Sequence, residues 1–278
     1  MKSIYKITAL VFLVAIACNK QQNDIKESNP VSKIYYENWQ RNKVEIYTVS
    51  RKRIVVPYGV FSMIDVKKYP KFISAIRNLT IDMKEVPEYY SQLYALRNIE
   101  RLCLENINAD SVDVDFSKYR NLHTLIIGIS SGKSLFEKHQ LITSVTRISI
   151  VGCSELESIE SGINDFRNLI NLSFTNIPEN TKYNFSFAAF KSLRNLNMWK
   201  CHMKTIPGDI TSSQTIESLD LSGNELSDLP WNLVKMKKLK YLIVRHNLFA
   251  EKPTVLKTFK FGSQFYILSS KEIPECSN

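Results

Sequence analysis

Glycine and cysteine are both scarce in this chain of 278 residues, and each shortage excludes a class of protein. Eight glycines are too few for a fold whose chemistry depends on several glycine-rich phosphate loops. Five scattered cysteines do not form the framework of a small disulfide-rich domain. No run of 18 apolar residues occurs, so the sequence predicts no membrane-spanning helix. With 44% apolar and 23% charged residues, the composition is that of an ordinary globular protein.

The first 18 residues have the pattern of an export signal. Lys2 and Lys6 precede an apolar run over residues 7–17. As a helix this run would be about 16 Å long, roughly half the thickness of a bilayer core, so it is typical of a signal peptide. It ends in VAIAC, residues 14–18, which resembles the lipobox of bacterial lipoproteins.

The lipobox resemblance implies that residues 1–17 are removed and that the Cys18 thiol receives diacylglycerol. The polar residues 18–32 then form a flexible tether between membrane and domain. Asn19 resembles outer-membrane sorting in some Gram-negative bacteria, so we expect a lipid-anchored protein of the bacterial cell envelope, at the outer membrane. The membrane face, periplasmic or outer, stays open. The alternative is an ordinary secretory signal with an incidental cysteine.

One motif recurs at intervals of 23 or 24 residues through most of the chain. Its clearest copy is IESLDLSGNEL, residues 216–226, and its pattern is L-x-x-L-x-L-x-x-N-x-L. We count eight units, whose first residues are Ile76, Ile99, Leu122, Val145, Leu169, Leu193, Ile216 and Leu239.

Positions 1, 4 and 6 of the motif are apolar in all eight units. The alternation around positions 4 and 6 predicts a short half-buried strand, with these two side chains inward and positions 3, 5 and 7 outward. Position 4 holds Leu79, Leu102, Leu125, Ile148, Leu172, Leu196, Leu219 and Leu242. Position 6 holds Ile81, Leu104, Ile127, Ile150, Phe174, Met198, Leu221 and Val244.

This pattern resembles the leucine-rich repeat family over about two thirds of the chain. The resemblance implies an α/β solenoid: a right-handed superhelix with a parallel concave sheet and short helices or irregular turns on the convex side. One repeat cannot bury its inward face alone, so stacked neighbours and capped ends supply the stability. We expect an N-terminal cap over 33–75, the solenoid over 76–262, and a C-terminal cap and tail over 263–278.

Position 9, where the family uses asparagine to satisfy backbone groups after the strand, is irregular in this chain. Asn224 and Asn247 keep the asparagine, whereas Cys153 and Cys201 stand there as small buried substitutes. These two thiols lie two strands apart, about 10 Å, which is too far for a disulfide. Cys103, at outward position 5, is expected to be exposed.

The outward positions predict a binding surface on the concave sheet. Large aromatic and arginine side chains anchor protein interfaces, and four large side chains fall within three successive units. They are Trp199, Tyr241, Ile243 and Arg245. Ile126 with Val151 forms a second, weaker apolar spot, and Arg101 and Arg147 add outward cations. Alternatively, the segment from Phe259 onward covers Tyr241 and Ile243.

The formal charge of +10 raises the question of an anionic partner. The outward columns are nevertheless balanced, with Arg101, Arg147 and Arg245 against Asp82, Glu105 and Asp220. The strand face therefore lacks the basic stripe with stacking aromatics that nucleic-acid binding needs, and we expect no nucleic-acid partner. The excess cations belong to the tether, caps and convex turns, as a solvated surface or as an attraction for anionic lipid or glycan.

Catalytic and metal-binding motifs find no support in the sequence. Residues 128–134, GISSGKS, have one residue too few between the glycines for a phosphate-binding loop, so we expect no nucleotide. The four histidines lack metal-ligand spacing, and His202 and His246 are expected in exposed turns. We therefore predict no enzyme, metal or cofactor. The predicted function is a membrane-anchored envelope protein that binds a protein partner through the concave face; the alternative is a glycan or polysaccharide binder.

Overall fold

The structure is a computed structural model that describes residues 55–57, 77–82, 94, 96–111, 114–138, 140–257 and 266–268. The predicted signal peptide, Cys18 and the predicted tether lie outside these residues, as do the predicted N-terminal cap except for 55–57 and the predicted C-terminal cap and tail except for 266–268. The chain divides into a smaller unit, residues 1–105 with 118–122, and a larger unit, residues 106–117 with 123–278.

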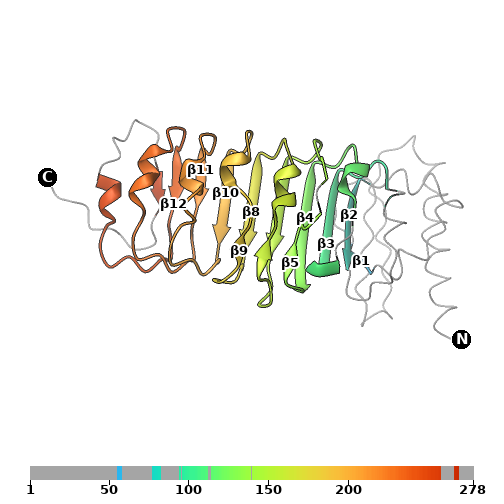
Figure 1. The fold of residues 1–278 in the computed structure, drawn as a ribbon, viewed down its shortest axis with the longest axis horizontal. Coiled ribbons are helices and arrows are strands. Elements are labelled where there is room, and N and C mark those ends of the chain that lie inside the picture. Colours follow the sequence, from blue (N-terminus) through green and yellow to red (C-terminus); the bar gives the residue numbers. More distant parts are fainter. Residues whose placement is uncertain are drawn as a thin grey trace, which may run out of the picture. The chain divides into compact units, whose positions relative to one another are not determined.

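A parallel sheet with one strand from each repeat forms the larger unit (Figure 1). Consecutive strands along the chain are neighbours in this sheet, so each repeat places its strand beside the strand of the previous repeat. The strands are β4 (Thr124–Ser131), β6 (Arg147–Val151), β8 (Asn171–Thr175), β10 (Asn195–Trp199), β11 (Ser218–Asp220), β12 (Tyr241–Ile243) and β13 (Tyr266–Leu268).

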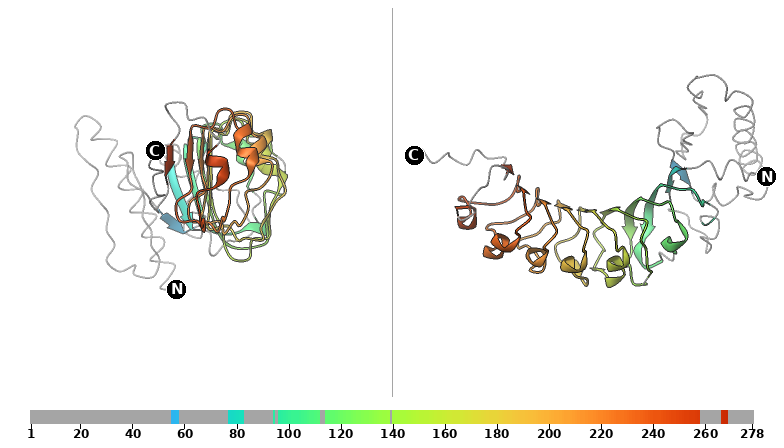
Figure 2. Two further views of the ribbon diagram at one scale, coloured as in Figure 1. Left: turned by 90° about the vertical axis from the view of Figure 1, so that its left-hand side faces the viewer. Right: turned by 90° about the horizontal axis from the view of Figure 1, so that it is seen from above.

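Shorter elements complete the coils of the larger unit. A second parallel sheet joins β5 (Ser134–Leu135), β7 (Ser158–Ile159) and β9 (Lys182–Tyr183). Six 3-10 helices are η2 (Ala109–Ser111), η4 (Ser161–Asp165), η5 (Phe187–Ala189), η6 (Ile210–Ser212), η7 (Trp231–Lys235) and η8 (Thr254–Lys257). Another, η3 (Phe116–Lys118), ends in the smaller unit. Figure 2 shows the long sheet on the inner, concave side of the larger unit and the helices on its outer, convex side.

The smaller unit contains the same kind of strand. Here β1 (Val55–Pro57), β2 (Asn78–Asp82) and the first part of β3 (Arg101–Asn108) pair in parallel and in sequence order. β1 falls within the segment for which the sequence predicts a cap.

The strand register confirms the repeat frame. Leu196 of β10 stands opposite Leu172 of β8 and Leu219 of β11, so each strand pairs with its neighbour at the same motif position. Among the described residues at positions 1, 4 and 6, none is more than 9% exposed. At about 25 cal/mol for each Å² of apolar surface, burial of these columns is the main stabilising term of the fold. The predicted solenoid with inward leucine columns is therefore confirmed.

Asn224 at position 9 satisfies the backbone where the chain turns away from β11. Its side chain is buried, and its Oδ1 accepts hydrogen bonds from the amides of Cys201 at 2.9 Å and Met203 at 3.2 Å. Its Nδ2 donates to the carbonyls of Met198 at 2.7 Å and Leu221 at 2.8 Å. One side chain thus links two repeats, because four backbone groups that face no partner strand find partners in it.

Strand length differs between repeats with and without an asparagine at position 9, although position 9 alone does not set it, since β8, with Ile177 there, has five residues. The strands β11 and β12, whose repeats contain Asn224 and Asn247, have three residues each. The strands β3 and β4, whose repeats have Ile107 and Ser130 there, have eight residues each.

A left-handed backbone conformation recurs at position 8. The residues concerned have φ between 52° and 70°: Asn106, Asn176, Lys200, Gly223 and His246. Glycine and asparagine adopt this conformation readily, whereas for other residues it costs about 1–2 kcal/mol of conformational free energy. Position 8 therefore fixes the direction in which the chain leaves the sheet in these repeats. Lys200 and His246 adopt this conformation despite its steric cost.

Aromatic side chains fill the interior behind β8. The Phe174 ring lies 5.6 Å from the Tyr183 ring and 6.4 Å from the Phe187 ring, both in edge-to-face arrangements. The rings of Phe185 and Phe187 lie 4.8 Å apart. Because these residues come from β8, β9, η5 and the segment before it, the cluster joins the sheet to the convex side of one repeat.

Candidate binding surface

Trp199 is the largest exposed side chain on the concave sheet, and its neighbours hold its indole ring in place. The residue is 39% exposed at the end of β10. The Lys200 ammonium lies 4.5 Å from the ring centroid, a cation–π contact. A Cβ atom on Gly223 would lie only 3.2 Å from the indole Nε1, so the ring packs against the glycine backbone. The tryptophan is thus preorganised rather than free to rotate.

Tyr241 and Ile243 occupy outward positions on β12, and Arg245, at the next outward position of the motif, follows two residues after the strand ends. Tyr241 is 42% exposed, Ile243 is half-buried and Arg245 is exposed. The alternative in which the segment from Phe259 onward covers Tyr241 concerns residues that, except for 266–268, lie outside the described part of the chain. At about 3.3 Å per residue, Tyr241 and Arg245 stand about 13 Å apart along the strand.

Only one strand separates Trp199 from this line. The outward positions of β11 and its continuation hold Ser218, Asp220 and Ser222, which are small. At about 4.8 Å between strands, Trp199 and Arg245 lie about 10 Å apart across this row. The structure therefore brings the four main predicted residues onto one face, and we call Trp199, Tyr241, Ile243 and Arg245 the aromatic surface.

Amide and carboxylate groups line the sheet beside the aromatic surface. The side-chain Nδ2 of Asn195 on β10 donates to Oδ1 of Asn171 on the neighbouring strand β8 at 2.8 Å. Asn197 Oδ1 accepts the amide of Trp199 at 3.0 Å, and Asp220 Oδ1 accepts the amide of Ser222 at 2.9 Å. The position 5 side chains of Asn197 and Asp220 therefore bind backbone amides near the ends of their strands, and Asn197 helps to fix Trp199.

The second predicted spot is smaller. Ile126 on β4 is half-buried, and Val151 on β6 is 38% exposed. Ile126 stands opposite Ser149, two residues before Val151, so the two apolar side chains are diagonal neighbours. Arg147, also on β6, is exposed beside them. Arg101 is exposed on β3 in the smaller unit.

The expectation that Cys103 is exposed is wrong, since this residue is only 4% exposed. Its paired residue on β2, Thr80, is also 4% exposed. Both lie at position 5, in the middle of the outward face, where small side chains are flanked by positions 3 and 7 and by both neighbouring strands. The alternation of a strand predicts which face a side chain takes but not how deeply its neighbours cover it.

The thiols at position 9 are free, as the strand spacing predicts. Cys201 is 1% exposed, and burial raises the pKa of its thiol to about 12. Its Sγ lies 3.6 Å from the carbonyl oxygen of Phe174 and 3.5 Å from that of Trp199. Cys153 is half-buried, so it is less covered than the sequence suggests. His202 and His246 lie in exposed turns, as predicted.

The segment 128–134 uses its loop amides internally. Gly132 has φ of 92°, and a Cβ there would lie 2.5 Å from Asn108 Oδ1. The amides of Lys133 and Ser134 both donate to Asp110 Oδ1, at 2.7 and 2.8 Å. The donors that a phosphate would require are therefore bound by a carboxylate of the same chain.

Among the described residues, no group of three or more histidine, cysteine or acidic side chains lies close enough to hold a metal ion. Within the same residues, no helix has the length and apolar character needed to cross a bilayer.

Sequence reasoning missed the partners of Trp199. The Lys200 contact depends on a left-handed residue at position 8, which turns its side chain back toward the ring. A signal existed, because glycine or asparagine occupies position 8 in several repeats and favours that conformation. The ring contact itself depends on a side-chain rotamer, which no pattern of residue types encodes.

The comparisons with known proteins agree with this geometry. The leucine-rich repeat family model matches residues 215–236, which contain the clearest copy of the motif. Among solved structures, the leucine-rich repeat domain of the type III effector XopL is 17% identical, with a TM-score of 0.51 over 80% of this chain and 77% of that one. The internalin-like protein lmo2027 of Listeria monocytogenes is also 17% identical, with a TM-score of 0.52 over 71% of this chain and 59% of that one.

A leucine-rich repeat protein of Leptospira interrogans is 18% identical, with a TM-score of 0.48 over 78% of this chain. This chain spans 58% of the length of that structure. No curated protein sequence matches this chain. At these identities the likeness shows the fold and nothing about partners.

Proposed function

Because the chain has the leucine-rich repeat fold, we propose that it is a non-enzymatic binding protein that recognises a protein partner through the aromatic surface. The observation that carries the proposal is the exposure of Trp199 and Tyr241 beside Arg245 on an otherwise small and polar sheet. Tryptophan, tyrosine and arginine are the residue types that dominate binding energy at protein interfaces.

Preorganisation supports the same proposal. Lys200 and Gly223 both contact the Trp199 ring, so binding a partner costs little entropy for ordering that side chain. Trp199, Tyr241 and Ile243 also lie on paired strands rather than on loops, so the backbone holds these three positions at a regular spacing, and Arg245 follows two residues after β12. Ile126, Val151 and Arg147 extend the contact toward β4 and β6.

The proposed location rests on the N-terminal sequence alone. We place the protein in the bacterial cell envelope, at the outer membrane, with Cys18 acylated and residues 18–32 as a tether. The test is incorporation of a labelled fatty-acid analogue into the chain in cells. The label should be lost in Cys18→Ser, and equal incorporation into both chains would overturn the anchor without affecting the proposed binding surface.

The binding proposal is tested by capture of partners from envelope extracts. Trp199→Ala and Arg245→Ala should each reduce capture of a specific protein at least about tenfold, with little change in thermal unfolding. Trp231→Ala is the matched control, because it removes an exposed tryptophan from the convex side. Unaltered capture by both concave variants, or an equal loss in the control, would contradict the proposal.

A glycan partner is the second candidate, and the amide row favours it. Asn171, Asn195, Asn197 and Asp220 present polar groups beside an aromatic ring, which suits a sugar with many hydroxyls. A glycan array probed with the same chain separates the two candidates. Saturable binding to one glycan that is lost in Trp199→Ala, with no protein captured, would favour the glycan.

A further inference from the structure

A second exposed feature of the larger unit lies on η7 and the turn that follows it. The amide of Leu233 donates to the Pro230 carbonyl at 3.1 Å, that of Met236 to Leu233 at 3.0 Å, and that of Leu239 to Met236 at 3.0 Å. Leu233 lies on η7, Met236 and Leu239 follow the end of this helix at intervals of three residues, and all three are buried. The residues between them must therefore face outward.

Two outward lines result from this spacing. Trp231 and Val234, at i and i+3, are 58% and 36% exposed. Lys235, Lys237 and Lys238 are exposed next to them. We call these five residues the lysine–tryptophan strip. Its apolar members are unusual for a solvated surface, because a Trp side chain this exposed leaves apolar area in contact with water.

The strip carries positive charge that the chain does not neutralise. Lys235 and Lys237 form no ion pair with any described residue. Lys238 lies near Glu217, but this carboxylate is already bound by Lys240 at 2.7 Å and by Arg194 at 3.0 Å. Three cations therefore act on one carboxylate.

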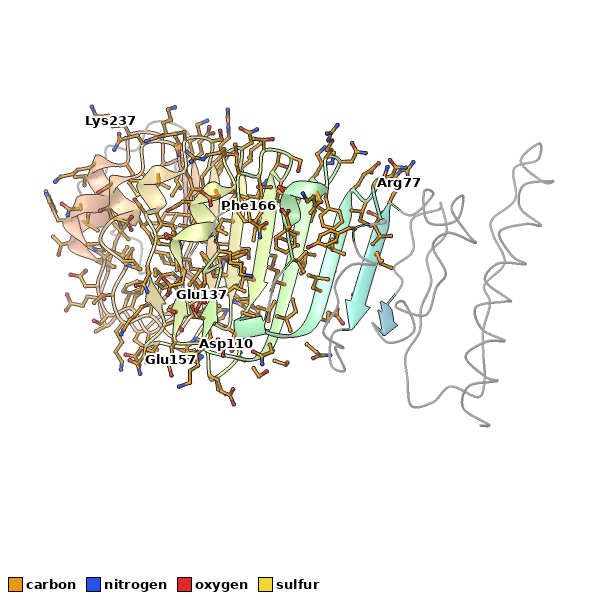
Figure 3. The ribbon with its side chains drawn as sticks, turned by 45° about the vertical axis from the view of Figure 1, so that its right-hand side comes forward. Arg77, Asp110, Glu137, Glu157, Phe166 and Lys237 are labelled. Carbon is orange, nitrogen blue, oxygen red and sulfur yellow. The ribbon has the colours of Figure 1, made fainter. Side chains whose placement is uncertain are left out.

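Figure 3 shows Lys237 at one edge of the larger unit and the carboxylates Asp110 and Glu157 at the opposite edge. At that opposite edge Lys133 lies 3.0 Å from Glu157, so this lysine is paired. The formal charge of +10 lies mostly in residues 1–76, which hold 13 Lys and Arg against 5 Asp and Glu. The strip is therefore a local cluster of cations rather than the source of the net charge.

We propose that the lysine–tryptophan strip binds the surface of a bilayer that contains anionic lipid. Lysines attract anionic headgroups, and tryptophan is the side chain that prefers the boundary between headgroups and acyl chains. Charge alone would also attract a dissolved polyanion. The exposed Trp231 and Val234 favour the bilayer, because only a bilayer offers an apolar phase directly beneath its phosphates.

This surface is separate from the aromatic surface, and the proposal does not require acylation of Cys18. Trp231 and Trp199 therefore serve as controls for each other. Trp231→Ala should weaken membrane binding and leave partner capture intact, whereas Trp199→Ala should do the reverse.

The experiment is co-sedimentation of the full chain with vesicles, with Cys18→Ser in every protein to exclude an acyl chain. Vesicles of phosphatidylcholine alone are compared with vesicles that also contain phosphatidylglycerol. Replacing Lys235, Lys237 and Lys238 with Gln should weaken binding to the anionic vesicles about 100-fold, at about fivefold for each lysine. Raising the salt to 1 M should weaken wild-type binding in the same direction, because the screening length falls to about 3 Å.

The matched control replaces Lys133, Lys182 and Lys204, at other exposed sites, with Gln. It removes the same charge and should keep wild-type binding to anionic vesicles. The apolar N-terminal run is present in all proteins, so it does not affect the differences between them. A blue shift of tryptophan emission on binding should disappear in Trp231→Ala and persist in Trp199→Ala.

Three results would overturn the proposal. Equal losses in the two lysine variants would show attraction by net charge alone. Full binding by Trp231→Ala, without loss of the blue shift, would show that no apolar contact forms. Binding to soluble dextran sulfate as tight as to the anionic vesicles, and equally insensitive to Trp231→Ala, would assign the strip to a dissolved polyanion instead.

Discussion

Replacing Asn224 with alanine should destabilise the solenoid more than any other polar substitution in the last three repeats. The side chain is 4% exposed and makes four hydrogen bonds of 2.7–3.2 Å to backbone groups in two repeats. Loss of each bond costs about 1 kcal/mol, and the orphaned groups have no access to water, so we expect a total of about 4 kcal/mol. That is a large share of the roughly 5–15 kcal/mol of a typical domain.

Two further asparagine substitutions should reduce the free energy of unfolding by less than Asn224→Ala does. Asn247 makes similar bonds, with Leu226 at 3.0 Å and Leu221 at 3.0 Å, but it is only half-buried, so water can replace part of what is lost. Asn247→Ala should therefore cost about 2 kcal/mol. Asn232→Ala, on the exposed side of η7, should change stability by less than about 0.5 kcal/mol.

The assay is urea unfolding with the m-value monitored, since a changed m-value would signal loss of cooperativity between repeats. Hydrogen exchange adds a local readout, because the amides of Cys201 and Met203 lose their acceptor in Asn224→Ala and should exchange faster. If Asn224→Ala were no more destabilising than Asn232→Ala, the role assigned to the position 9 asparagine would be refuted.

Three other substitutions or reactions test separate parts of the structure. Gly223→Ala should reduce the free energy of unfolding by about 1 kcal/mol, because the left-handed φ of 70° is strained for alanine. It should also displace Trp199, whose Nε1 would lie 3.2 Å from the new Cβ. Urea unfolding measures the first effect and partner capture the second, and unchanged capture would show that the position of the ring does not matter. At pH 8 in the native state, Cys201 should resist iodoacetamide while Cys153 reacts, because burial raises the pKa of Cys201 to about 12; peptide mass spectrometry after labelling decides, and equal labelling would contradict the burial. Phe187→Ala should cost about 3–5 kcal/mol because the ring is fully buried among aromatic neighbours, whereas Phe185→Ala, at a half-buried site, should cost less in the same urea assay; the reverse order would contradict the packing described.

The sequence predicts the fold well because one periodic constraint repeats. An apolar residue at positions 1, 4 and 6 of every unit fixes the strand, its inward face and its register at once, as the pairing of Leu172, Leu196 and Leu219 shows. A one-residue error in register would turn all these leucines toward solvent, so the frame is strongly determined.

Burial depth and side-chain contacts are less accessible to sequence reasoning. The outward position of Cys103 is compatible with its place in the motif, yet neighbours cover it. The contact of Lys200 with the Trp199 ring depends on backbone dihedral angles at position 8 and on rotamers. The lysine–tryptophan strip was visible in the sequence only as part of a general excess of lysine, since its alignment depends on 3-10 geometry rather than on an α-helix.

Site-specific photocrosslinking in intact cells tests the central claim that the aromatic surface binds a protein. A benzophenone amino acid replaces Tyr241 on the concave face in one chain and Glu137, an exposed residue away from that face, in another. The account predicts one discrete, protease-sensitive adduct from position 241, lost when Trp199→Ala is added, and none from position 137. Equal protein adducts from both positions, or an adduct at 241 that survives Trp199→Ala undiminished, would contradict it.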